Sequence, residues 1–133
     1  LIADGDMHLN DLALLKMADA AAKSFTSVRF APLYDAVTTR VFPGLAGDRM
    51  ALKLNGKDDR LTRGDFLTLA RTIGVPQGVA EAAIAEVTTN LTNAVETVRL
   101  PGFAAKSEAA SAVQGQIMGL VRARCAALAD EAS

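Results

Sequence analysis

Residues 77–99 read QGVAEAAIAEVTTNLTNAVETVR. Apolar side chains recur in this stretch at intervals of three and four residues, the spacing that places them on one face of an α-helix. We expect this face to be buried along roughly 33 Å of helix. It consists of Val79, Ala83, Ile84, Val87, Leu91, Val95 and Val98.

Two further helices are predicted on either side. Thr62 followed by Asp65 has the pattern of a capping box, and the helix that it opens ends near Gly74 and Pro76. After the break at Pro101-Gly102, Ser107 and Glu108 predict the start of a third helix. Its expected inner face consists of Ala110, Val113, Ile117, Leu120 or Val121, and Leu128. Residues 61–133 are therefore predicted to be a helical bundle.

Residues 1–60 have a different pattern, in which short apolar runs alternate with turn-forming residues. Asn55-Gly56 is typical of a type I′ turn between two strands. The expected elements are a hairpin of Leu12–Leu15 with Val28–Phe30, a turn or two of helix around Asp35–Val41, and a strand at Met50–Leu54 that leads into the Asn55-Gly56 turn.

The composition agrees with a mainly α fold that contains a small β-hairpin region. Half of the residues are hydrophobic, alanine is abundant and aromatic residues make up only 5%. With no repeat or flexible linker, residues 1–133 are predicted to form one domain. Tyr34, beside Pro32 and Leu33, is expected to be a packed core aromatic.

Several functions are disfavoured by the same numbers. The 14 Lys+Arg and 15 Asp+Glu leave no basic excess for direct binding to duplex DNA. One cysteine, Cys125, and one histidine, His8, exclude a disulfide framework and a Cys/His zinc site. No run of 18 apolar residues predicts a membrane span.

The first eleven residues hold a dense acidic and polar cluster. A calcium-binding EF-hand loop is excluded by Leu9 and Leu15, because these positions require glycine and glutamate. The members of the cluster are Asp4, Asp6, His8, Asn10 and Asp11.

The spacing within this cluster permits a second interpretation. In protein kinases a catalytic-base aspartate is followed five residues later by a magnesium ligand, and a second magnesium-binding aspartate follows a hairpin. Asp6, Asp11 and Asp35 occupy those relative positions. On spacing alone the other interpretation, a merely solvated polar loop, remains open.

The residues around these aspartates resemble the HipA-type serine/threonine kinases. Gly5–Leu15 is similar to that family's catalytic loop, written Gly-Asp-x-His-x-Lys-Asn, followed by a hydrophobic strand. Ala31-Pro32-Leu33-Tyr34-Asp35 is similar to its metal-binding segment. Thr38–Pro43 and Met50–Lys57 continue the likeness, so the resemblance covers essentially the whole chain. It implies the C-terminal helical lobe of a protein-kinase-like fold.

This resemblance implies a role for each site residue. Asp6 would be the catalytic base, and Asp11 and Asp35 would be the magnesium ligands. His8 would support the loop by hydrogen bonds. Two positions depart from the family: its lysine is Asn10 here, and its asparagine is Asp11. We expect these changes to weaken turnover while metal binding is retained.

The resemblance also implies the biological setting. Such kinases are toxins of type II toxin-antitoxin modules, which implies ATP and Mg²⁺ as cofactors, a protein Ser/Thr substrate (in the best-known members an aminoacyl-tRNA synthetase), and a cytoplasmic location. A HipB-like helix-turn-helix antitoxin would be the partner and would supply any contact with DNA. Because a glycine-rich phosphate loop and its lysine are expected to lie before Leu1, the chain alone is expected to be inactive. The alternative is a non-catalytic helical interaction module, or a degenerate kinase lobe.

Overall fold

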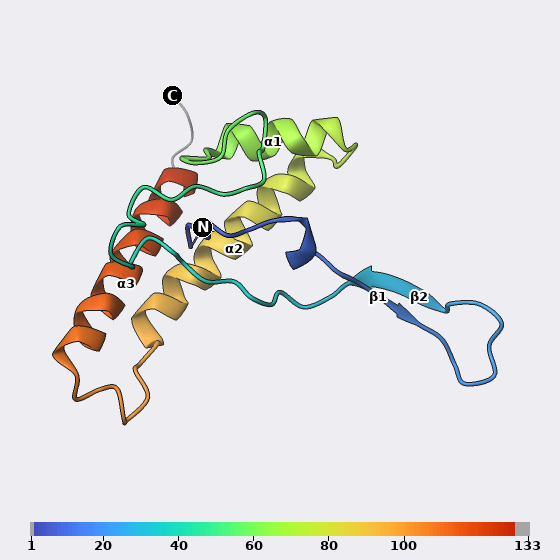
Figure 1. Cartoon of the computed structure of the whole chain (residues 1–133). Helices are drawn as coiled ribbons and strands as arrows, with labels where there is room; N and C mark the ends of the chain where they lie inside the picture. Colours follow the sequence, from blue (N-terminus) through green and yellow to red (C-terminus); the bar gives the residue numbers. More distant parts are fainter. Residues whose placement is uncertain (1, 130–133) are drawn as a thin grey trace.

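A computed structural model describes residues 2–129 and contains three helices and one hairpin within them (Figure 1). This confirms the predicted fold class. The elements are the 3₁₀ helix η1 (Leu9–Asp11), the strands β1 (Leu14–Met17) and β2 (Ser27–Phe30), and the helices α1 (Arg63–Thr72), α2 (Gln77–Thr97) and α3 (Glu108–Ala129). The predicted bundle residues 130–133 lie outside the described part. None of the described helices is long and apolar enough to cross a membrane.

The helices form one layer of the molecule. Helices α2 and α3 lie side by side, and α1 packs against both of them (Figure 1). The core between α2 and α3 is built from Val95, Val121 and Cys125, each at most 7% exposed. Ile2 packs against this core together with Leu91, Ile117 and Met118, so the start of the chain is fastened to the helical layer.

Helix α1 begins where the sequence predicts. The Asp65 carboxylate accepts hydrogen bonds from the Thr62 backbone N–H, at 2.8 Å, and from the Thr62 hydroxyl, at 2.9 Å. Lys57 Nζ lies 2.9 Å from the same carboxylate. The helix ends before Gly74, whose φ of 77° favours glycine. The predicted capping box is thus confirmed.

The apolar face of α2 is less buried than its periodicity predicts. Val95 is buried, but Val79, Val87 and Val98 are each about half exposed or more. The buried positions besides Val95 are small or polar: Ala80 and Thr88. At Val87 the physical reason is that this part of the face lines a cavity beneath the loops of residues 2–61. Val79 and Val98 lie at the two ends of the face, outside the wall of that cavity.

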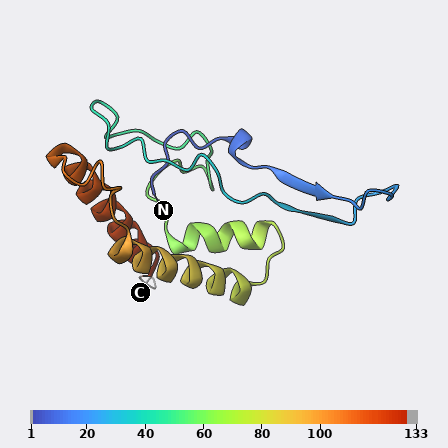
Figure 2. The same cartoon turned by 90° about the horizontal axis from the view of Figure 1, so that it is seen from below.

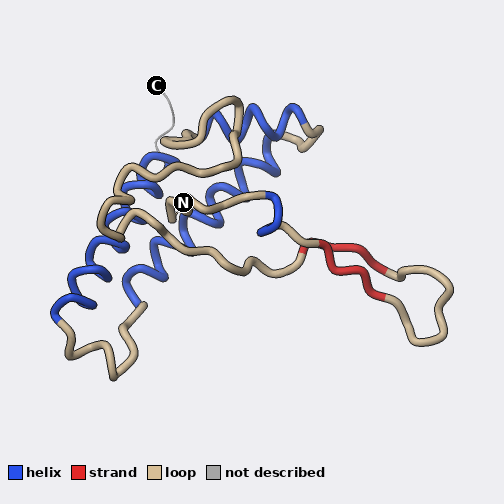
Figure 3. The backbone as a smooth tube through the Cα atoms, viewed as in Figure 1, coloured by secondary structure: helices blue, strands red, loops and turns tan. Residues whose placement is uncertain are grey.

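Residues 2–61 form a second layer of loops over the helices, from which the hairpin projects (Figure 2). The predicted hairpin is confirmed with small changes in its ends. Leu14 pairs with Phe30 and Met17 with Ser27, in antiparallel register. All eight strand residues are exposed, and Figure 3 shows both strands extending away from the helices.

The predicted helix around Asp35–Val41 is wrong, because this segment is irregular. Asp35 itself has a φ of 51°, in the left-handed region, which a right-handed helix cannot include. The segment makes a single turn instead, in which the Phe42 N–H donates to the Thr39 carbonyl at 3.1 Å.

The predicted strand at Met50–Leu54 is also wrong, although the turn that follows it is confirmed. Asn55 and Gly56 both have positive φ, 52° and 79°, as a type I′ turn requires. Leu54 and Lys57 exchange both backbone hydrogen bonds across it. No regular ladder continues from there, because the Leu52 N–H donates instead to the Met7 carbonyl at 3.3 Å. One further bond joins the two sides of the turn, from the Met50 N–H to the Asp58 carbonyl at 3.1 Å.

Three charged side chains fasten the loop layer to α3. The Asp59 carboxylate accepts hydrogen bonds from Arg124 on α3 and from Arg40, whose Nη2 lies at 2.9 Å. All three side chains are only about one-fifth exposed. Burial raises the pKa of Asp59, but the hydrogen bonds from Arg124 and Arg40 outweigh it and hold that pKa far below its ordinary value.

We expect Asp59→Asn to lower the free energy of unfolding at pH 7 by about 2–3 kcal/mol, because it leaves two partly buried guanidinium groups without a counter-charge. Asp58→Asn is the matched control. Asp58 pairs with Arg49, which is 62% exposed, so its loss is expected to cost less than about 1 kcal/mol. Urea unfolding measures both variants.

The pH dependence of the free energy of unfolding provides a second check on the role of Asp59. A lowered folded-state pKa stabilises the protein above the ordinary value of 3.8, and this stabilisation is lost as the pH falls below it. The difference between wild type and Asp59→Asn should therefore narrow below pH 3.8. An equal difference at all pH values would contradict the role assigned to this cluster.

Candidate functional site

The loop that contains Asp6 is closed by one carboxylate. Asp11 Oδ2 accepts hydrogen bonds from the backbone N–H of His8 and from His8 Nδ1, both at 2.7 Å. This double contact spans η1 and fixes the orientation of its three residues. His8 thus makes hydrogen bonds of the kind expected from a residue that supports the loop.

The same contact shifts the pKa values of both His8 and Asp11. The hydrogen bond to Asp11 raises the pKa of His8 above its ordinary 6.5. The His8 backbone N–H, followed by the His8 side chain, lowers the pKa of Asp11 below its ordinary 3.8. Both shifts favour the ion pair of an imidazolium with a carboxylate at this contact.

Two hydrogen bonds hold the start of the chain against the rest of the loop layer. Met7 accepts the bond from the Leu52 N–H, and the Ala3 carbonyl accepts one from the buried Thr38 hydroxyl, at 3.3 Å. The segment that carries Asp6 is thus fixed on both sides of that residue.

Gly5, which precedes Asp6, lies in a place where no side chain fits. A methyl group on its α-carbon would overlap with Asp48 Oδ2 and with Thr39 Oγ1. Glycine is required here by close packing, since its φ is not in the left-handed region. This packing fixes the backbone immediately before the predicted catalytic base.

Tyr34 connects the two predicted functional segments. Its hydroxyl donates a hydrogen bond to the backbone carbonyl of Asn10, across the base of the hairpin. The expectation that Tyr34 is a core aromatic is wrong, because the residue is 45% exposed. The ring lies at the surface of the loop layer, and its hydroxyl bonds to the carbonyl of Asn10. Asn10 precedes Asp11 and Tyr34 precedes Asp35, so this bond restrains both predicted metal ligands.

The structure brings some of the predicted site residues together but not all. His8 contacts Asp11, and Asn10 is joined to Tyr34. Asp6 and Asp35 are exposed, and Asp35 adopts the strained left-handed conformation that often marks functional positions. In residues 2–129 no three carboxylate, imidazole or thiolate groups are clustered closely enough to hold a metal ion.

The donor chemistry nevertheless fits magnesium. Mg²⁺ prefers hard oxygen ligands, uses one or two protein carboxylates and keeps several waters or phosphate oxygens. Asp11 and Asp35 would hold it, and the ion would supply charge neutralisation at a transferred phosphoryl group. His8 occupies only one Asp11 oxygen, Oδ2, and within the described chain Oδ1 has no hydrogen-bond partner.

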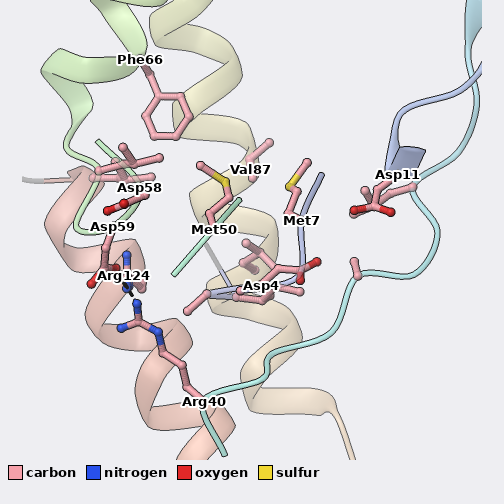
Figure 4. A pocket seen from close by; sticks show the side chains of 18 of the residues that line it. Asp4, Met7, Asp11, Arg40, Met50, Asp58, Asp59, Phe66, Val87 and Arg124 are labelled. Carbon is pink, nitrogen blue, oxygen red and sulfur yellow. Dashed lines mark hydrogen bonds and ion pairs between the residues drawn. The ribbon is translucent and has the colours of Figure 1, made fainter. Parts of the chain in front are cut away.

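A cavity of about 550 Å³ lies between the loop layer and the helices. Figure 4 shows Phe66, Met50, Met7 and Val87 along it, with Arg40, Asp59 and Arg124 at one side. Gly5, Met7 and Asp11 contribute to its wall, so the predicted catalytic loop borders the cavity.

The two aspartate-bearing loops thus lie on either side of the hairpin, in the part of the chain that packs on the helices. The HipA-like C-terminal domain matches residues 1–95. The chain therefore belongs to this family, whose members are kinase-like toxins. The match spans both predicted functional loops, α1 and most of α2, whereas α3 lies beyond it. No curated protein and no solved structure matches the chain.

The contacts of Asp59, Asp48 and the Tyr34 hydroxyl were not predicted from the sequence. Asp59 and Arg124 are 65 positions apart, and Tyr34 and Asn10 are 24 apart. Neither distance corresponds to a helical or strand period. Only the Gly5-Asp6 pair within the family motif indicated that glycine matters beside the base.

The single histidine gives a direct test of the loop geometry. By NMR titration we expect the His8 pKa of the wild type to lie above 6.5 and to return toward 6.5 in Asp11→Asn. Asp6→Asn is the control, because Asp6 acts on His8 only through space and less strongly. Equal shifts in the two variants would contradict the His8–Asp11 contact.

The sign of the linked stability follows from these directions. Because its pKa is raised, His8 stabilises the folded protein below pH 6.5. This stabilisation is lost as the pH rises through the pKa that His8 has in the folded state. Because its pKa is lowered, Asp11 stabilises the folded protein above pH 3.8. This stabilisation is lost as the pH falls through the pKa that Asp11 has in the folded state. The contact thus contributes most between pH 3.8 and 6.5.

Gly5→Ala should destabilise the protein by about 1–3 kcal/mol, because the added methyl must displace Asp48 or Thr39. Gly47→Ala is the matched control, since no atom lies within 4 Å of the methyl that it would add. We expect that control to stay within about 0.5 kcal/mol of the wild type in urea unfolding. Equal losses in the two variants would refute the close packing at Gly5.

Proposed function

We propose that this chain is the catalytic lobe of a HipA-like kinase that transfers the γ-phosphate of ATP to a serine or threonine of a protein. The observation that carries the proposal is the family match, which covers both aspartate-bearing loops. The exposed Asp6 and Asp35 support it, because their carboxylates are accessible to a ligand. Asp11 supports it because His8 engages only its Oδ2.

In this proposal Asp6 accepts the proton of the substrate hydroxyl as that oxygen attacks phosphorus. Close packing at Gly5 and the Leu52–Met7 hydrogen bond orient Asp6. Asp11 and Asp35 hold Mg²⁺, while the Tyr34 hydroxyl keeps their two segments in register. Orientation by a rigid surround is what makes such groups effective.

The residues at positions 10 and 11 affect the expected rate of phosphate transfer. A lysine at position 10 would add a positive charge near the phosphates, and Asn10 cannot supply one. Asp11 adds a negative charge within five residues of Asp6, although His8 partly compensates it. We propose that metal binding is retained and that phosphate transfer is slow.

In the natural full-length protein, the double variant Asn10→Lys/Asp11→Asn should raise the rate of phosphate transfer from ATP by about tenfold or more. Asp6→Asn in the same background should lower it by about 100-fold, as expected on removal of a general base. The rate is measured with labelled ATP, and calorimetry of Mg-ATP binding to each variant is the control for nucleotide affinity. A rate that does not change in the double variant would contradict the proposed slowing.

The second candidate function is a non-catalytic interaction module derived from a kinase lobe. The exposed apolar residues of the hairpin and the segments flanking it, among them Leu14, Phe30 and Leu33, favour it because they offer a surface for a protein partner. The HipB-like helix-turn-helix antitoxin is the partner that we propose in either case, and it would make any contact with DNA. Absence of Mg-ATP binding in calorimetry would favour the module.

A further inference from the structure

The hairpin and the segments next to it carry most of the large apolar side chains that are exposed among residues 2–129. Eleven of these 19 side chains belong to residues 9–37. Both strands extend away from the helices (Figure 2), and an isolated two-stranded hairpin is only marginally stable in water. A large exposed apolar surface of this kind is typical of a site for a protein partner.

Each strand also has an edge whose backbone groups point away from the other strand. The Ala31 N–H donates to the Ala13 carbonyl at 2.8 Å, so these two residues form a hydrogen-bonded pair at the base of the hairpin. Bonded and non-bonded pairs alternate in an antiparallel ladder. The next non-bonded pairs are Leu14 with Phe30 and Lys16 with Val28. Their N–H and C=O groups therefore point outward, and within residues 2–129 these groups have no other backbone partner.

The edge of β1 is the better of the two for an added strand. On the edge of β2 the next outward position toward Asp35 is Pro32, which has no N–H to donate. On β1 the outward positions Leu14 and Lys16 place one apolar and one cationic side chain on the same face. Lys16 is exposed, and its Nζ lies 5.4 Å from the centre of the Phe25 ring.

The charge of the hairpin favours an acidic peptide as the occupant of this edge. Residues 14–30 contain three basic side chains and one acidic side chain, and none of the four forms an ion pair within the described chain. A second copy would bring like charges together across the new strand pair, which is unfavourable. A membrane surface could attract the basic side chains, but it would leave the N–H and C=O groups of the edge unpaired. An acidic strand satisfies both the charges and the backbone. The four charged residues are Lys16, Asp19, Lys23 and Arg29.

We propose that an extended acidic segment of the protein substrate adds to the edge of β1 as a third strand, with a carboxylate opposite Lys16 and an apolar residue opposite Leu14. In strand addition the backbone bonds give affinity and alternate side chains give specificity. The assignment of this segment to a substrate rests on the proposed kinase function.

The direction of the added strand orders the residues of the substrate. An antiparallel partner continues the hairpin and forms the more stable ladder. Because β1 begins three positions after Asp11 and runs away from η1, the C-terminal end of an antiparallel segment points toward η1. The recognised segment is therefore an acidic residue, any residue and an apolar residue, and the serine or threonine that accepts the phosphate follows them.

The binding test uses the chain without ATP and the capped peptide acetyl-Gln-Thr-Glu-Thr-Val-Thr-amide. Calorimetry should show saturable binding, which becomes about fivefold weaker when the glutamate is replaced by lysine. N-methylation of the glutamate and the valine should weaken binding by about tenfold or more, because their N–H groups face β1. N-methylation of the threonines on either side of the glutamate is the matched control and should change binding little, since those N–H groups face away.

Hydrogen exchange identifies the edge that is used. The bound peptide should slow exchange of the outward N–H groups of Leu14 and Lys16, while those of Val28 and Phe30 exchange as in the free chain. Slower exchange at Val28 and Phe30 instead would overturn the assignment to β1.

A charge reversal on the chain tests the pairing with Lys16. Lys16→Glu should reverse the preference, so that the lysine peptide binds more tightly than the glutamate peptide. Lys23→Glu is the matched control, because it makes the same change of charge at an exposed position in the loop between the strands, and it should keep the preference for glutamate. An equal effect of the two variants would contradict a carboxylate opposite Lys16.

Kinase assays on the natural full-length protein separate this inference from the proposed function. A peptide with a serine after the valine should be phosphorylated, and its KM should rise about fivefold when the glutamate is replaced by lysine. Phosphorylation with the same KM for both peptides would overturn the docking inference alone. No phosphorylation of any protein or peptide, with peptide binding retained, would overturn the kinase function and with it the assignment of the segment to a substrate.

Two other results would also overturn the proposal. Dimerisation of the chain that Lys16→Glu changes, without peptide binding, would assign the hairpin to a second copy. Binding to vesicles of phosphatidylcholine and phosphatidylserine, without peptide binding, would assign it to a membrane surface.

Discussion

The ion-pair cluster of Asp59 with Arg40 and Arg124 is the constraint on which the rest of the structure depends. The helices pack through a small core, and no large side chain among the described residues is fully buried. Apolar burial alone therefore gives the loop layer little hold on the helices. A carboxylate shared by two arginines, one in the loops and one on α3, supplies that connection. Because the cluster is largely shielded from water, its Coulomb attraction is less screened than that of surface pairs.

The candidate site is built on this attached loop layer by contacts of short range. Gly5 packs against Asp48, His8 closes the loop through Asp11, and Tyr34 joins Asn10 to the segment of Asp35. These contacts fix backbone positions while Asp6 and Asp35 stay accessible to ligands. Such a division between supporting and accessible groups is typical of phosphoryl-transfer sites, where positioning accounts for most of the catalysis. The substitutions at Asn10 and Asp11 alter charge within this frame and not the frame itself.

Much of the fold could be predicted because it depends on local patterns. The 3.6-residue period, the Thr62–Asp65 cap and the Asn55-Gly56 turn each act within a few residues, and all three appear in the structure. Local patterns do not predict the structure where contacts with a distant segment determine it. Val87 has the period of a core residue but faces a cavity, and Leu52 bonds to Met7 and not to a neighbouring strand. The predicted helix at Asp35–Val41 is likewise absent, and Asp35, its expected first residue, has a positive φ.

By itself, the sequence determined the helices, the hairpin and the positions of Asp6, Asp11 and Asp35 along the chain, because periodicity, capping and motif spacing are encoded over short distances. Only the tertiary structure decided which side chains hold those positions in place. The Asp59–Arg124 and Tyr34–Asn10 contacts join residues 65 and 24 positions apart. The close approach of Asp48 and Thr39 to Gly5 also emerges only on folding, because it joins residues more than 30 positions apart.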